Sequence, residues 1–135
     1  MILVDSSVWI AYFNGDSTWQ ADLLDRLLSS EPILTGDLIL TEVLQGFRSD
    51  NDFKKAKKFM STLHFRDMAG YDRAIKAAQN YRSLRKKGVT VRKTIDVIIG
   101  TYCIETETFL LHSDRDFDPM EKYLGLKVVH PNDLL

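Results

Sequence analysis

The sequence has almost no cysteine: Cys103 is the single one among 135 residues. One cysteine excludes an intrachain disulfide framework and a cysteine-based zinc site. The apolar runs are only a few residues long, which excludes a membrane span. The opening residues, M-I-L-V-D, lack the basic region and the long apolar stretch of a signal peptide. We therefore expect a protein of the reducing cytoplasm.

Several common catalytic motifs are also missing. The chain has no G-x-x-x-x-G-K-[ST] loop, no G-x-G-x-x-G fingerprint and no G-x-S-x-G elbow. The histidines, His64, His112 and His130, show no metal-ligand spacing. These absences argue against a P-loop nucleotidase, a dinucleotide-binding enzyme and a serine hydrolase.

The overall composition is that of a folded protein. Hydrophobic residues make up 44% of the chain and charged residues 27%, which excludes a disordered or low-complexity protein. The length suits one domain over residues 1–135, with a single core. Trp9, Phe13 and Trp19 suit either that core or a partner surface, and we expect them in the core.

The net charge of -1 hides a strong segregation of charge along the chain. Residues 48–93 contain 14 basic and four acidic residues, and this segment carries a formal charge of +10. The remainder of the chain carries -11. A basic segment beside an acid-rich one suits a protein that attracts a polyanion and holds cations elsewhere. The alternative is that the lysine-rich helices simply have faces exposed to water.

Short apolar segments alternate with helical patterns. We expect strands at residues 1–4, 33–35, 108–112 and 127–130, and a weak one at 64–67. We expect helices at residues 7–13, 18–28, 40–47, 51–63, 71–87 and 93–106. This alternation, without two-residue hairpin turns, predicts a layered α/β fold with a mostly parallel sheet of about five strands.

Five carboxylates occupy positions that a purely structural role explains poorly. Asp5 ends the first strand, and Asp114 and Asp116 follow the strand T-F-L-L-H. Glu42 and Asp96 interrupt apolar helical stretches. Taken singly, each acid could form a turn or cap a helix. Because ligands bind beyond the carboxyl ends of parallel strands, we expect these acids to meet in one crevice.

A gathered set of carboxylates requires a cation, because like charges repel strongly away from water. An all-oxygen ligand set selects Mg²⁺, Mn²⁺ or Ca²⁺. The D-R-D-F-D-P segment lacks the glycine and the bidentate glutamate of an EF-hand. Mg²⁺ or Mn²⁺ therefore remains, and both suit phosphoryl transfer.

Four motifs, in this order and spacing, resemble those of one family. They are V-D-S-S-V-W-I, T-E-V-L-Q-G-F, T-I-D-V-I-I-G and H-S-D-R-D-F. Together they resemble the PIN-domain nucleases, and more narrowly the VapC-type toxins of prokaryotic toxin–antitoxin pairs. The resemblance spans nearly the whole chain. It assigns the catalytic quartet to the four acids Asp5, Glu42, Asp96 and Asp114, and supporting roles to Asp116, Ser7 and Ser113.

The resemblance implies a three-layer α/β/α sandwich and endonucleolytic cleavage of RNA with one or two Mg²⁺ or Mn²⁺ ions. It also implies a VapB-like antitoxin partner and a homodimer. The metal ligands implied are Asp5, Asp96, Asp114 and Asp116. Glu42 would orient a water molecule or accept its proton, and the two serines, Ser7 and Ser113, would hold the carboxylates in place.

Basic residues are the candidates for holding the RNA backbone. They are Arg115, Lys54, Lys55, Lys57, Lys58, Arg82, Arg85 and Lys86. Two alternatives stay open at this point. One is a non-catalytic module that binds RNA or a protein partner, and the other is a receiver-like signalling domain that binds Mg²⁺ at strand ends. A phosphatase with a D-x-D nucleophile fits poorly, since the first strand is followed by D-S-S.

Overall fold

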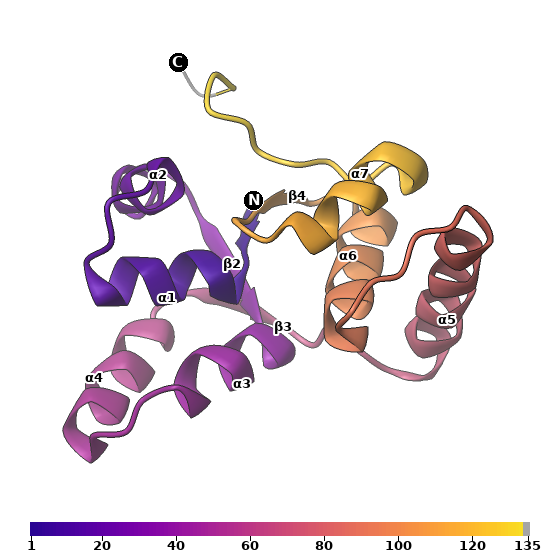
Figure 1. Ribbon diagram of the computed structural model, residues 1–135. Helices are drawn as coiled ribbons and strands as arrows, with labels where there is room; N and C mark the ends of the chain where they lie inside the picture. Colours follow the sequence, from indigo (N-terminus) through magenta and orange to yellow (C-terminus); the bar gives the residue numbers. More distant parts are fainter. Residues whose placement is uncertain (134–135) are drawn as a thin grey trace.

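A four-stranded parallel sheet forms the centre of the molecule in the computed structural model, which describes residues 1–133 (Figure 1). The strands are β1 (Ile2–Val4), β2 (Ile33–Gly36), β3 (His64–Arg66) and β4 (Phe109–Leu111). Their order across the sheet is β3-β2-β1-β4, and each neighbouring pair is parallel. The two middle strands, β1 and β2, are short and apolar, as expected for strands covered on both faces.

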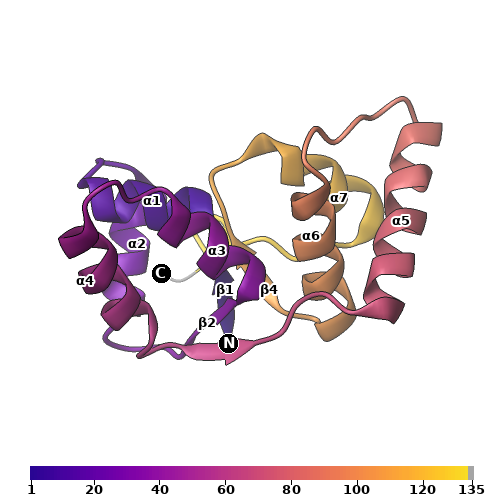
Figure 2. The same ribbon diagram turned by 90° about the horizontal axis from the view of Figure 1, so that it is seen from below.

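Helices cover both faces of this sheet (Figures 1 and 2). On one side lie α1 (Ser6–Asn14), α2 (Trp19–Leu27), α3 (Asp37–Gln45) and α4 (Asp50–Met60). On the other side lie α5 (Tyr71–Lys86), α6 (Thr94–Thr106) and α7 (Asp118–Leu124), with a short 3₁₀ turn η1 (Arg115–Phe117) before α7. The arrangement confirms the predicted α/β sandwich.

The strand that we expected at residues 127–130 does not form as a full strand. It forms a single parallel bridge, Leu110 to Val128, with backbone bonds from the Leu110 amide to Lys127 and from the Val129 amide to Leu110. The described sheet therefore has four strands where about five were expected. Helix α7 was missed because it is short, although Pro119 in its first turn suits a helix start.

The core lies between the sheet and the two helical layers. Leu3, Val4, Leu110 and Leu111 from the two paired strands β1 and β4 are fully buried. Trp9 of α1 is also fully buried and packs near Phe13 and Phe59, as expected. Trp19, in contrast, is 38% exposed, so the expectation that it lies in the core was wrong. Within residues 1–133, no helix is both long and apolar enough to cross a membrane.

Candidate metal-dependent active site

Asp5 stands where β1 passes into α1, at the carboxyl edge of the sheet. Its side chain caps α1, since Oδ2 accepts hydrogen bonds from the Ser7 amide at 3.0 Å and from the Ser7 hydroxyl at 2.6 Å. The Ser7 oxygen in turn accepts from the Ser113 amide at 3.1 Å, which ties the segment after β4 to the start of α1. Asp5 Oδ1 is buried and has no hydrogen-bond partner within residues 1–133.

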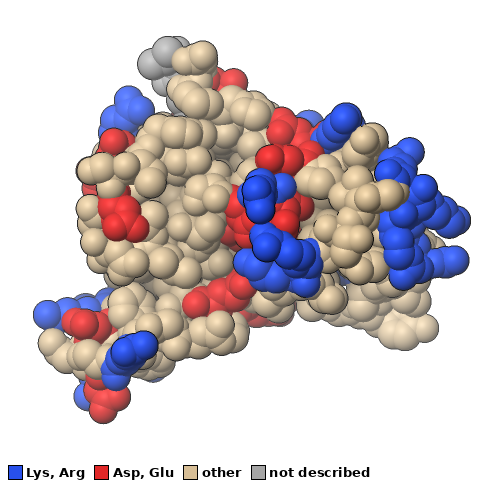
Figure 3. Space-filling view, in the orientation of Figure 1, with Lys and Arg blue, Asp and Glu red and all other residues tan. Residues whose placement is uncertain are grey.

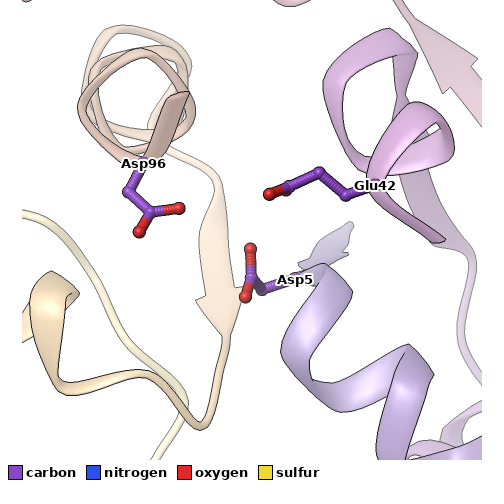
Figure 4. Close-up of side chains that lie close together, drawn as sticks. All are labelled: Asp5, Glu42 and Asp96. Atoms are coloured by element: carbon purple, nitrogen blue, oxygen red, sulfur yellow. The ribbon is translucent and has the colours of Figure 1, made fainter. Parts of the chain in front are cut away.

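Asp96 and Glu42 reach the same place from the two helical layers. Asp96 lies in the first turn of α6 and is 2% exposed. Glu42, on α3, accepts a hydrogen bond from the Ser6 hydroxyl at 3.1 Å. One oxygen atom from each of Asp5, Glu42 and Asp96 lies within 4.8 Å of the others, and the three carboxylates point toward one another (Figure 4).

A second group joins the first through a shared residue. Oxygen atoms of Asp96, Asp114 and Asp116 also lie within 4.8 Å of one another. Asp114 caps η1, because its Oδ1 accepts from the Asp116 amide at 2.9 Å. Since Asp96 belongs to both groups, the structure gathers all five acids that the sequence singled out. We call these five residues the acidic cluster.

The electrostatics of the acidic cluster follow from burial. Burial raises the pKa of Asp5 and of Glu42 above their usual values. Burial, with the nearby charge of Asp5, raises the pKa of Asp96 to about 7. Burial acts in the same direction on Asp114, but the hydrogen bonds from the Asp116 amide and from Lys93 outweigh it, so the pKa of Asp114 is lowered. The surroundings of Asp5, Glu42 and Asp96 therefore stabilise the negative charge of these carboxylates less well than water does.

Two basic residues that the sequence motifs did not single out contact these acids. Lys93 Nζ lies 3.1 Å from Asp114 Oδ2 and 3.8 Å from Asp96 Oδ2. Arg92 Nε lies 3.5 Å from Asp116 Oδ2. The position of Lys93 three residues before Asp96, in the segment that starts α6, was the available signal for finding it. Figure 3 shows basic side chains against the acidic patch at the centre of this face.

The supporting residues lie close to the acids, but they contribute different atoms. Ser7 donates its hydroxyl to Asp5, as the resemblance implies. Ser113 is exposed, and its contact with Ser7 is made by the backbone amide. Arg115 begins η1, one residue after Asp114. The functional roles of these three residues stay predictions.

The other basic candidates lie on two helices at opposite ends of the molecule (Figures 1 and 2). The lysines Lys54, Lys55, Lys57 and Lys58 are exposed on α4. The residues Arg82, Arg85 and Lys86 are exposed on α5. The structure therefore divides the predicted RNA-binding set into two separate surfaces, and neither is part of the acidic cluster.

The cluster fits a hard divalent cation. Three of its oxygen atoms, Asp5 Oδ1, Asp96 Oδ2 and Asp116 Oδ2, are buried and accept no hydrogen bond from the described residues. A buried carboxylate oxygen without a donor is costly unless a cation binds it or a proton neutralises it. Mg²⁺ and Mn²⁺ prefer such oxygen ligands.

Comparison with known proteins agrees with this geometry. A family model for the PIN domain matches residues 2–123. The chain belongs to the PIN domain family. VapC ribonuclease Mb1587 of Mycobacterium bovis and ribonuclease VapC11 of Mycobacterium tuberculosis are each 33% identical to it over 132 residues, which is 94% of this chain and 96% of theirs.

Solved structures of low sequence identity share the PIN fold. The VapBC2 complex of Rickettsia felis, bound to a DNA fragment from its promoter, matches with a TM-score of 0.73 at 18% identity, over 96% of this chain and 98% of that one. The sarcin-ricin loop cleaving toxin VapC20 of Mycobacterium tuberculosis matches with a TM-score of 0.63 at 19% identity, over 87% and 93%. The family assignment removes the receiver-like alternative.

Proposed function

We propose that this protein is an endoribonuclease that depends on Mg²⁺ or Mn²⁺ and acts as the toxin of a type II toxin–antitoxin pair. The PIN domain match and the VapC relatives support the reaction class. The observation that carries the proposal is the acidic cluster itself, in which carboxylates from four separate segments converge. Three of its buried oxygen atoms have no hydrogen-bond donor among residues 1–133.

The metal would be held by Asp5, Asp96, Asp114 and Asp116. The unpartnered oxygen atoms of Asp5, Asp96 and Asp116 support this ligand set. When bound, a divalent cation lowers the pKa of a coordinated water molecule and neutralises charge on the phosphodiester. The chain itself prepares the ligands: the Ser7 hydroxyl and amide fix the Asp5 carboxylate, and the Asp116 amide fixes Asp114.

Glu42 is the proposed proton acceptor. The Ser6 hydroxyl holds one of its oxygens, and burial raises the pKa of its carboxyl group above the usual value. A raised pKa makes a carboxylate a better base near neutral pH. Glu42 would therefore orient the attacking water and take its proton as the phosphodiester bond breaks.

The remaining partners follow from the family and from charge. We infer that the chain works as one domain, pairs with a VapB-like antitoxin, forms a homodimer and acts in the cytoplasm, where its RNA substrate lies. The solved relatives support the antitoxin, since several are VapBC complexes. Arg115 and the basic faces of α4 and α5 would hold the RNA backbone, because phosphate contacts position a substrate without reading its sequence.

The test is to incubate the purified protein with total cellular RNA, with and without Mg²⁺, and to map the cut ends. We expect cleavage with Mg²⁺ and none in EDTA. Asp96→Asn should abolish cleavage while the fold persists, and Asp72→Asn, an exposed acid on α5, is the matched control. RNA binding without metal-stimulated cleavage would favour the non-catalytic alternative instead.

A further inference from the structure

The two tryptophans of this protein have opposite environments. Trp9 is fully buried in the core, whereas Trp19 is 38% exposed at the first turn of α2. Its partly exposed indole offers a flat apolar surface on which another ring can stack. Trp19 is therefore a candidate recognition residue.

Trp19 lines a hollow that adjoins the acidic cluster. The hollow has a volume of about 280 Å³, and its wall includes Gln20, Asp114, Arg115 and His130. Asp114 belongs to both the hollow and the cluster. A molecule in the hollow would lie directly beside the carboxylate that faces Lys93. The volume is just below the roughly 300–1,000 Å³ of sites for drug-sized ligands, so the hollow suits one small flat group.

The polar groups of the wall suit a heterocycle with both donors and acceptors. Gln20 carries an amide, which is anchored by a hydrogen bond from its Nε2 to the His112 carbonyl at 3.4 Å. His112 is 9% exposed, and its Nε2 is buried without a hydrogen-bond partner within the described chain. Arg115 adds a positive charge to a wall that also includes Asp118 and Glu121. An aromatic face together with an amide and a guanidinium is the combination that binds unstacked nucleic-acid bases.

We propose that this hollow binds one base of single-stranded RNA, next to the phosphodiester that the acidic cluster cleaves, with Trp19 as the stacking surface. This inference rests on the proposed ribonuclease function. The shared Asp114 sets the relation between the two sites: the base in the hollow belongs to a nucleotide that flanks the cut. A base inside a duplex is stacked on both faces, so the substrate must present this base unpaired.

Tryptophan fluorescence tests the proposal on the unmodified protein. Nucleosides are the probes and free ribose is the control, in EDTA, since neutral probes avoid repulsion by the acidic cluster. We expect at least one nucleoside to quench the emission in a saturable way, and ribose to have no effect. Trp19→Phe should remove the quenching, because Trp9 is fully buried. Quenching that persists in this variant, or its absence with every nucleoside, would overturn the proposal.

A second measurement uses single-stranded RNA oligonucleotides in EDTA. Trp19→Ala should weaken their binding by roughly 5- to 150-fold, which is the usual effect of losing one base–aromatic stack. Tyr71→Ala is the matched control, since Tyr71 is the most exposed aromatic residue among the exposed large side chains and lies on α5. Equal losses in the two variants would contradict a specific role for Trp19.

The outcome is separable from that of the proposed function. If the protein binds nucleosides at Trp19 but cuts no RNA, then the hollow is a base site and the ribonuclease proposal fails. If it cuts RNA and Trp19→Ala cuts at the rate of the unmodified protein, then the hollow is not used. Mn²⁺ affinity should be the same in Trp19→Ala and in the unmodified protein, because Trp19 is not among the proposed ligands.

Discussion

The ammonium group of Lys93 lies 3.1 Å from Asp114 Oδ2, so a side chain of this protein already neutralises one of the carboxylates proposed to bind the metal. The same ammonium is 3.8 Å from Asp96 Oδ2. Because Lys93 is 53% exposed, it is free to move away when a divalent cation enters. Lys93 and the metal therefore compete for the same negative charge.

Removing this competitor should strengthen metal binding. We expect Lys93→Met to bind Mn²⁺ about fivefold more tightly, since a unit charge about 4 Å away in water-like surroundings is worth about 1 kcal/mol. Isothermal titration calorimetry measures the affinity. Lys87→Met is the matched control and should leave the affinity unchanged, since Lys87 is an exposed lysine that follows the last residue of α5. Weaker Mn²⁺ binding by Lys93→Met would show that Lys93 organises the ligands.

The stability of the metal-free protein should fall as the pH rises. The pKa of Asp96 is about 7 in the fold against its ordinary value of 3.8, so the folded state binds the proton more tightly than the unfolded state. The stabilisation from this proton is fully present below about pH 4 and is lost as the pH rises through about 7. Burial raises the pKa of Asp5 and of Glu42 as well, which adds to the trend. Urea unfolding in EDTA at several pH values measures it.

Asp96→Asn isolates the contribution of this one carboxyl group. Since the amide cannot ionise, we expect the variant to lose much of the pH dependence between about 4 and 7 and to be more stable than the unmodified protein at pH 8, by roughly 2 kcal/mol. Asp72→Asn should keep the full pH dependence. Added Mn²⁺ should stabilise the unmodified protein more than Asp96→Asn. Identical pH curves for Asp96→Asn and the unmodified protein would remove Asp96 as the cause.

Loss of the Ser7 hydroxyl should weaken metal binding without unfolding the protein. Ser7→Ala removes the 2.6 Å hydrogen bond to Asp5 and the acceptor of the Ser113 amide. Groups that hold a metal ligand in place typically contribute 10- to 100-fold to metal affinity or activity, and we expect a loss of about that size in Mn²⁺ affinity. Ser29→Ala, at the exposed end of α2, is the control, since Ser29 bonds only the nearby Arg26 carbonyl within residues 1–133. An unchanged Mn²⁺ affinity in Ser7→Ala would count against this role.

Salt dependence should tell which basic surface holds RNA. Removing one cationic side chain that binds a phosphate should lower the slope of log affinity against log salt by roughly 1. We expect glutamine at the four lysines of α4, or at Arg82, Arg85 and Lys86 of α5, to reduce this slope in filter-binding assays. Because the two surfaces lie at opposite ends of the molecule, the two variants report on them separately. If a variant keeps the original slope, then the basic residues of that helix contact water and not RNA phosphates.

The acids could be found from sequence because each lies in a local context that constrains it. Asp5 and Asp114 follow apolar strands, and parallel strands end at one edge of the sheet. The ion pair of Lys93 with Asp114 could not be predicted in the same way, since the only local signal was the spacing of Lys93 three residues before Asp96. Trp19 was misjudged for a related reason: hydrophobic character does not tell which of two tryptophans reaches the core.

The fifth strand shows the limit of local patterns. Residues 127–130 contain two adjacent valines, which favour a strand, but β4 pairs with this segment at one bridge only. Helix α7 is too short for a clear period. Both elements depend on tertiary packing that the sequence does not display.

The five carboxylates of the acidic cluster come from positions as far apart as 5 and 116. A chain emerging from the ribosome therefore carries only Asp5 and Glu42 for most of its synthesis, and it has no assembled centre until the segment around Asp114 has left the exit tunnel and reached β1. A centre built this way cannot assemble until nearly all of the chain has been synthesised.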